Sequence, residues 1–143
     1  MKKLLLMMAC VAVILVAVTG CACKFCGLGG GDKEGVRTIG TEELKNIVEK
    51  KTALIFDARS VKYDTGERIP GAKALSAESS PEDVANAILG KNAAVVVYCS
   101  NTKCPASGNL AAYLKKLGYT NIMEYPEGIE GWKAAGNKVE KID

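Results

Sequence analysis

The sequence contains no histidine among its 143 residues. A cysteine–histidine mechanism needs an imidazole base, and most zinc hydrolases need imidazole ligands, so both classes are excluded. Aromatic residues are scarce, at 6% of the chain, and none interleaves with a cluster of Lys and Arg. Because the formal net charge is only +3, we expect no nucleic-acid partner.

Apolar residues, in contrast, are plentiful. The chain is 48% hydrophobic and 24% charged, which allows a packed core. Its length fits one domain with an additional segment better than it fits two domains.

The first twenty residues have the composition of a secretory signal. Lys2 and Lys3 precede a fifteen-residue apolar run from Leu4 to Val18, and small residues follow. This run is short for a membrane-spanning helix, which needs about 20 apolar residues. Its ending, VTGC, resembles the lipobox of bacterial lipoproteins, in which the cysteine is lipidated and becomes the first residue of the mature chain. We therefore expect cleavage after residue 20 and lipidation of Cys21, with an uncleaved anchor as the alternative.

Residues 21–35 are rich in glycine and read as a flexible tether of roughly 20 Å reach. They include a C-x-x-C pair, Cys23 and Cys26, without the strand and helix that surround a redox motif. We expect Cys23 and Cys26 to form a local disulfide or to remain free thiols. The alternative is a zinc ion that they share with the pair Cys99 and Cys104. Either form of membrane attachment places the domain outside the cytoplasm, in the periplasm or on the cell surface.

Residues 36–143 alternate between strand and helix patterns. The most β-prone run, AAVVVY, is apolar throughout, as a central parallel strand should be. We expect helices to begin after Thr41 and Ser80 as N-caps, and one helix to end at Gly118. The expected strands are 36–39, 53–56, 71–75, 93–98 and 121–125, and the expected helices are 42–50, 80–89, 105–118 and 128–136. This order predicts an α/β fold with a mostly parallel central sheet flanked by helices on both faces.

Asp57 and Cys99 are candidate functional residues, because a carboxylate and a thiol can each take part in catalysis. Each lies directly after a predicted strand. Sites in parallel sheets form at the carboxyl ends of strands. Cys99 also opens a loop that precedes a helix, where unpaired N–H groups and the helix dipole stabilise a thiolate. A phosphatase loop of the Cys-x5-Arg type is excluded, because the fifth intervening position is occupied by Cys104 and is followed by Pro105 instead of arginine. Sulfur transfer and thiol–disulfide exchange remain, since neither needs a side-chain base.

Several motifs together resemble those of single-domain rhodanese-like sulfurtransferases. The matching segments are IFDARS (55–60), RIPGAKAL (68–75), VVVYCSN (95–101), LAAYLKKLGY (110–119) and EGIEGW (127–132). They occur in the family's order over nearly the whole of residues 36–140. The resemblance implies the rhodanese fold and a cysteine persulfide that carries sulfane sulfur from a donor such as thiosulfate to a thiophilic acceptor. It implies no cofactor.

By this resemblance, Cys99 is the catalytic cysteine, and Asp57 and Arg59 support the pocket. The loop residues expected to bind the anionic donor are Ser100, Asn101, Thr102 and Lys103, with the loop amides around the persulfide. Cys104 departs from the usual loop and makes a C-x4-C pattern. It is either a resolving thiol, the nucleophile itself, or a structural partner. The alternatives for the domain are therefore a dithiol–disulfide redox protein with a thioredoxin-like partner and an inactive binding module.

Overall fold

The structure of the protein is a computed structural model that describes residues 35–142. The predicted signal segment, Cys21 and the C-x-x-C pair lie outside the described residues, as does the tether except for Gly35. Within the described part of the chain, no helix is both long and apolar enough to cross a membrane.

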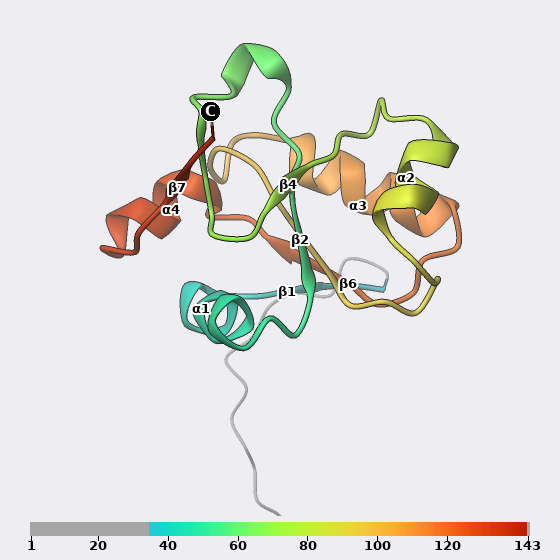
Figure 1. The fold of residues 1–143 in the computed structure, drawn as a ribbon, viewed down its shortest axis with the longest axis horizontal. Helices are drawn as coiled ribbons and strands as arrows, with labels where there is room; N and C mark the ends of the chain where they lie inside the picture. Colours follow the sequence, from blue (N-terminus) through green and yellow to red (C-terminus); the bar gives the residue numbers. More distant parts are fainter. Residues whose placement is uncertain (1–34, 143) are drawn as a thin grey trace, which may run out of the picture.

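A five-stranded parallel sheet forms the centre of the domain (Figure 1). Its strands are β1 (Val36–Thr38), β2 (Leu54–Asp57), β4 (Lys73–Ala74), β5 (Val95–Tyr98) and β6 (Ile122–Tyr125). They are arranged in the order β1-β6-β5-β2-β4, and each neighbouring pair is parallel. The most apolar strand, β5, is central and fully buried, because helices cover both of its faces.

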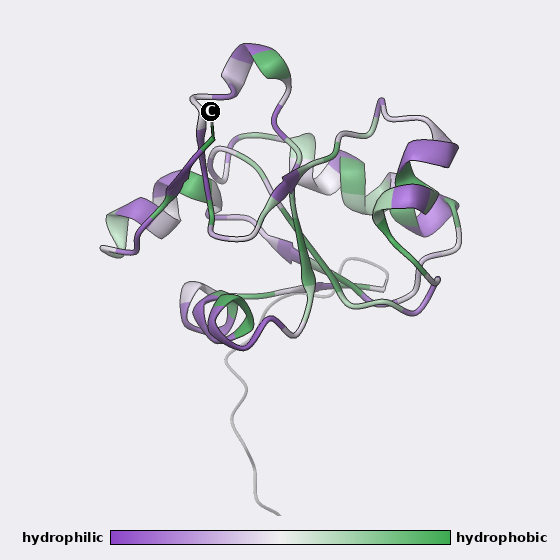
Figure 2. Cartoon of the chain, viewed as in Figure 1, coloured by the Kyte–Doolittle hydropathy of each residue, from purple (hydrophilic) through white to green (hydrophobic). Residues whose placement is uncertain are grey.

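Two helices cover each face of the sheet. Helices α2 (Pro81–Ala87) and α3 (Ala106–Lys116) pack on one face, and α1 (Thr41–Lys50) and α4 (Gly128–Ala134) pack on the other. In Figure 2 the inner strand β2 is hydrophobic, whereas the edge strand β4 and the helices α1 and α2 carry hydrophilic residues. This arrangement confirms the predicted fold class.

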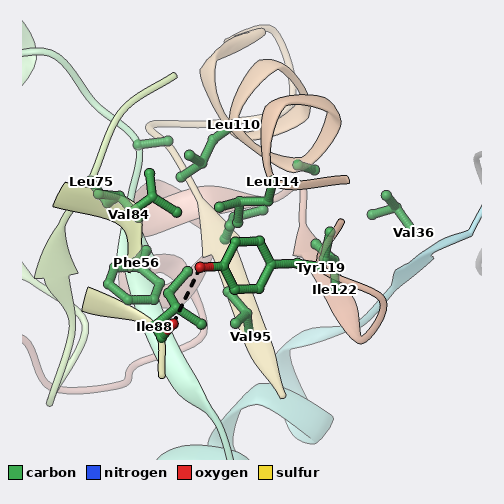
Figure 3. Packing of buried hydrophobic residues seen from close by; sticks show 13 residues of the cluster. Val36, Phe56, Leu75, Val84, Ile88, Val95, Leu110, Leu114, Tyr119 and Ile122 are labelled. Atoms are coloured by element: carbon green, nitrogen blue, oxygen red, sulfur yellow. Dashed lines mark hydrogen bonds between the residues drawn. The ribbon is translucent and has the colours of Figure 1, made fainter. Parts of the chain in front are cut away.

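Successive residues of β6 point into different halves of the core, because side chains alternate between the two faces of a sheet. Ile122 packs with the α2–α3 half, and Met123 packs with the α1–α4 half. Figure 3 shows the first of these halves, in which Leu110 and Leu114 of α3 lie above Val95. Tyr119 fits the apolar cluster because its hydroxyl donates a hydrogen bond of 3.2 Å to the carbonyl of Ile88.

Three helix ends were predicted from the sequence, and the structure confirms two of them. Ser80 caps α2 in a reciprocal capping box with Asp83, and Gly118 after α3 has a φ of +88°, as predicted. Thr41 does not cap α1. Its hydroxyl instead contacts the Tyr125 hydroxyl at 2.8 Å and donates to Glu127 Oε2 at 2.7 Å, so tertiary partners replace the local cap.

A small antiparallel ribbon completes the fold. Strand β3 (Glu67–Arg68) pairs with β7 (Glu140–Lys141), which brings the end of the described chain back beside the loop after β2. This loop also contains the short 3₁₀ helix η1 (Val61–Tyr63), the green turn that projects from the domain in Figure 1. Two-residue strands are too short to show a periodicity, so the sequence did not predict the ribbon.

Candidate active site

The loop between β5 and α3 begins at Cys99 and is held in place by α4. The N–H of Ile129 donates to the Cys99 carbonyl at 2.9 Å, and the N–H of Glu130 donates to the Ser100 carbonyl at 3.0 Å. Gly128 makes this approach possible, since a Cβ at that position would lie 2.4 Å from the Cys99 carbonyl oxygen. Its φ of +64° also favours glycine.

Asn101 turns the loop back on itself. Its side-chain Oδ1 accepts from the N–H of Lys103 at 3.0 Å, and its carbonyl accepts from the N–H of Cys104 at 3.1 Å. These two amides were expected to surround a persulfide, and they are used within the loop instead. The turn places Cys104 immediately before the N-terminus of α3, where the helix dipole favours negative charge.

Cys104 lines a pocket of about 350 Å³ beside the carboxyl ends of the strands. Pro105 and Ala106 also line this pocket, as do Arg59 and Tyr63 from the segment after β2. Burial acts to raise the pKa of the Cys104 thiol, but hydrogen bonds from the N–H groups of Ala106 and Ser100 and from the Cys99 thiol outweigh it. The net effect is a pKa below the ordinary thiol value.

Cys99 lies behind this pocket and is fully buried, with 0% exposure. Its Sγ is 3.2 Å from the carbonyl oxygen of Cys104, 3.6 Å from that of Asn101 and 3.4 Å from Ser107 Oγ. Burial raises the pKa of Cys99 above its ordinary value, although hydrogen bonds from the side chain and N–H of Ser107 act in the opposite direction. Both cysteines are free thiols.

Ser107 also connects Cys99 to a buried carboxylate. The Ser107 hydroxyl donates to Glu124 Oε1 at 2.9 Å, and both residues are at most 5% exposed. Sequence reasoning did not identify Glu124 as part of the site. The available signal was a single acidic residue inside an otherwise apolar strand, which is unusual for a buried position.

Asp57 and Arg59, which the resemblance predicted to support the pocket, form a buried ion pair. Arg59 Nη2 lies 2.7 Å from Asp57 Oδ2, and its Nε donates to both carboxylate oxygens at 3.0 and 3.1 Å. The buried Tyr98 hydroxyl donates to the same carboxylate at 3.1 Å. Arg59 also donates to the carbonyls of Tyr63 and Glu67, so it fixes the loop that forms one wall of the pocket.

The other predicted loop residues are less closely associated with Cys104. Thr102 and Lys103 are exposed and do not line its pocket. Ser100 lines a neighbouring hollow of about 590 Å³, which shares Arg59 and Tyr63 with the first pocket. The structure therefore brings together Cys99, Cys104, Ser107 and the Asp57–Arg59 pair, and it leaves Thr102 and Lys103 at the outer edge.

The chemistry available here is thiol chemistry. Among residues 35–142, no group of three or more His, Cys, Asp or Glu side chains is placed to hold a metal ion. What the site contains is one accessible thiol beside backbone N–H donors, a second thiol enclosed behind it, and a pocket of small-molecule size.

Two known proteins with related sequences are named thiosulfate sulfurtransferase. The thiosulfate sulfurtransferase GlpE from two strains of Pseudomonas putida is 29% identical over 98 residues, which is 68% of this chain and 86% of that protein.

Solved structures give the same fold. The BH2092 protein of Bacillus halodurans superposes with a TM-score of 0.65 at 23% identity, covering 73% of this chain and 77% of that one. The rhodanese-like domain of the Alr3790 protein of Anabaena sp. gives a TM-score of 0.61 at 26% identity, over 73% and 79% of the two chains. The family model described as the rhodanese-like domain matches residues 40–135. The chain therefore belongs to the rhodanese-like domain family.

Proposed function

We propose that this protein is a sulfurtransferase that carries sulfane sulfur as a cysteine persulfide on the 99–104 loop. The observation that carries the proposal is the Cys104 thiol, which lines a pocket and has a lowered pKa because loop and helix N–H groups face it. The similarity to proteins named thiosulfate sulfurtransferase supports the same reaction class.

We assign the attacking thiol to Cys104, in place of Cys99, which the resemblance to the family implied. A nucleophile must be reachable by its substrate and must ionise, and the thiolate is the reactive form. Cys99 is fully buried with a raised pKa, whereas Cys104 lines the pocket with a lowered one. The two amides that face Cys104, those of Ser100 and Ala106, would also stabilise the charge of a persulfide there.

The reaction has two displacement steps. The Cys104 thiolate attacks the outer sulfur of a donor such as thiosulfate, a sulfur–sulfur bond forms to Cys104, and sulfite leaves with the electron pair of the broken bond. A thiol acceptor, as its thiolate, then attacks the terminal sulfur, and Cys104 leaves as a thiolate. No redox cofactor or side-chain base is required at either step.

The charge of the pocket bears on which donor is used. Arg59 lines the pocket, but its charge is balanced by Asp57, and Glu78 adds a carboxylate to the lining. Attraction of an anionic donor would therefore depend mainly on the amides and the helix dipole. A panel of donors should include persulfides of small thiols as well as thiosulfate.

Peptide mass analysis after treatment with each donor tests the proposal. Trypsin cleaves after Lys91, Lys103 and Lys115, so Cys99 and Cys104 fall on separate peptides. Early in the reaction, the Cys104 peptide should gain one sulfur, about 32 Da, and Cys104→Ser should abolish the gain. Sulfur found on the Cys99 peptide in Cys104→Ser would return the role to Cys99, and no uptake from any donor would contradict the proposal.

A redox function is a second candidate, because the two thiols are free and Cys99 Sγ lies 3.2 Å from the Cys104 carbonyl oxygen. In this case Cys99 and Cys104 would cycle between dithiol and disulfide with a thioredoxin-like partner. A reversible disulfide in a protein that accepts sulfur from no donor would favour this function.

We further propose that the domain is attached to a bacterial membrane by lipid on Cys21 and works outside the cytoplasm. The support is the basic start, the apolar run and the VTGC ending of residues 1–21. Once Lys2 and Lys3 are removed, the chain has 17 basic and 16 acidic residues, so attachment would depend on the acyl chains instead of on charge.

A further inference from the structure

The two loop thiols are adjacent but face different surroundings. Cys104 lines the pocket, and Cys99 lies directly behind it with its Sγ 3.2 Å from the Cys104 carbonyl oxygen. Each thiol also affects the pKa of the other, raising that of Cys99 and lowering that of Cys104. The turn at Asn101, closed by the hydrogen bond from the Cys104 N–H to the Asn101 carbonyl, folds Cys104 back toward Cys99.

Cys99 is closed to any molecule in the pocket. It is 0% exposed, it does not line the Cys104 pocket, and carbonyl oxygens and the Ser107 hydroxyl surround its Sγ. A sulfur donor or an acceptor protein therefore cannot reach it in this conformation. Cys104 is the neighbour through which Cys99 can take part in the reaction.

We propose that Cys99 is an internal resolving thiol that discharges the Cys104 persulfide as hydrogen sulfide. This inference rests on the proposed sulfurtransferase function. It gives the site a second outcome besides sulfur transfer, namely reductive release of the sulfur.

The step balances in atoms and electrons. The Cys99 sulfur attacks the Sγ of Cys104, the bond to the terminal sulfur breaks, and that sulfur leaves as hydrosulfide. The terminal sulfur gains two electrons, and the two cysteines lose them as they form a disulfide. A dithiol reductant of the thioredoxin-like class then restores both thiols and closes the cycle.

The proton of Cys99 has a hydrogen-bonded path away from the sulfur. Ser107 Oγ is 3.4 Å from Cys99 Sγ, and it donates to Glu124 Oε1 at 2.9 Å. Because the terminal sulfur of the persulfide anion carries no proton, the proton of Cys99 passes to that sulfur, directly or through the Ser107 hydroxyl, and the sulfur departs as hydrosulfide. Attack on the inner sulfur is favoured over transfer of the persulfide to Cys99, because the carbonyl oxygens around Cys99 disfavour a persulfide anion there.

A single-turnover experiment on the full-length protein, solubilised in detergent and fully reduced, tests the inference. After excess reductant is removed, one donor is added, and released sulfide and the tryptic peptides are measured over time. We expect the wild type to release up to one sulfide per protein and to end with the Cys99 and Cys104 peptides linked. Cys99→Ser should release none and should accumulate the Cys104 persulfide, about 32 Da heavier.

The outcomes separate the inference from the function on which it rests. A stable Cys104 persulfide in the wild type, with no sulfide and no linked peptides, would overturn the inference and leave the sulfurtransferase proposal intact. Persulfide on the Cys99 peptide would also overturn it. No sulfur uptake by wild type or variant would overturn both. The wild-type measurement decides the matter even if Cys99→Ser fails to fold, and Cys99→Ala provides a second variant.

Discussion

Arg59 closes on the carboxylate of Asp57, two residues earlier in the chain, in an ion pair whose side chains are each 2% exposed. Because Arg59 also donates to the Tyr63 and Glu67 carbonyls, at 3.2 and 2.6 Å, the pair attaches one wall of the pocket to the end of β2. Burial acts to lower the pKa of Arg59, but the hydrogen bond and the charge of Asp57 outweigh it and raise the pKa. Arg59 therefore stays charged and acts on the site through the loop it holds.

Replacing Asp57 with Asn should destabilise the domain strongly. The change leaves the buried Arg59 with only the more distant Asp64 carboxylate, 3.8 Å away, and breaking a buried pair by removing one partner costs about 3–5 kcal/mol. Urea denaturation measures the loss. Glu43→Gln is the matched control, since it breaks the exposed Arg37–Glu43 pair at 2.6 Å and should have a much smaller effect. Equal losses in the free energy of unfolding would contradict the prediction that the buried Asp57–Arg59 pair stabilises the domain more than an exposed pair does.

Gly128→Ala should displace the cysteine loop. A Cβ there would lie 2.4 Å from the Cys99 carbonyl oxygen, and the positive φ adds about 1–2 kcal/mol of strain, so we expect a total loss of at least about 2 kcal/mol. Sulfur uptake by Cys104 should fall with it. Gly136→Ala is the control, because its φ is +78° and nothing lies within 4 Å of the added Cβ. A normal rate of sulfur uptake in Gly128→Ala would contradict the close contact between α4 and the loop.

The two thiols should respond differently to pH. A lowered pKa gives a larger thiolate fraction near neutral pH, so alkylation of Cys104 should rise through a midpoint below 9.0, the ordinary value. Cys99 should stay largely unlabelled over the same pH range, because it is enclosed and because burial raises its pKa. Iodoacetamide labelling of the two tryptic peptides measures both responses. Labelling of Cys99 at the lower pH would reverse the assignment of the nucleophile.

Loss of lipidation at Cys21 should detach the protein from the membrane. Cys21→Ala should abolish incorporation of a fatty-acid analogue, because Cys21 is the residue that the lipobox resemblance marks for acylation. Two or more acyl chains give stable attachment, so the variant should also leave the membrane fraction if the signal is still removed. Cys23→Ala is the control and should keep the label. Label that persists in Cys21→Ala, or that never appears in the wild type, would contradict the lipoprotein proposal.

Most of the architecture could be predicted from the sequence, because it depends on local patterns. The apolar run of β5 and the capping box of Ser80 and Asp83 each specify their element through neighbours in the chain. The position of Cys99 directly after a strand likewise placed the loop at the carboxyl edge of the sheet. These inferences needed only the periodicity of side chains and the hydrogen-bonding needs of helix ends.

The division of roles between the two thiols was decided by tertiary structure alone. In the sequence Cys99 and Cys104 are two thiols of one loop, and nothing local tells which is enclosed. The turn at Asn101 and the packing of α4 against Cys99 bury one thiol and leave the other in the pocket. Glu124 became part of the site in the same way, through a contact with Ser107 seventeen positions away. Burial and hydrogen-bond partners set the reactivity of a thiol, and both depend on segments that meet only when the chain folds.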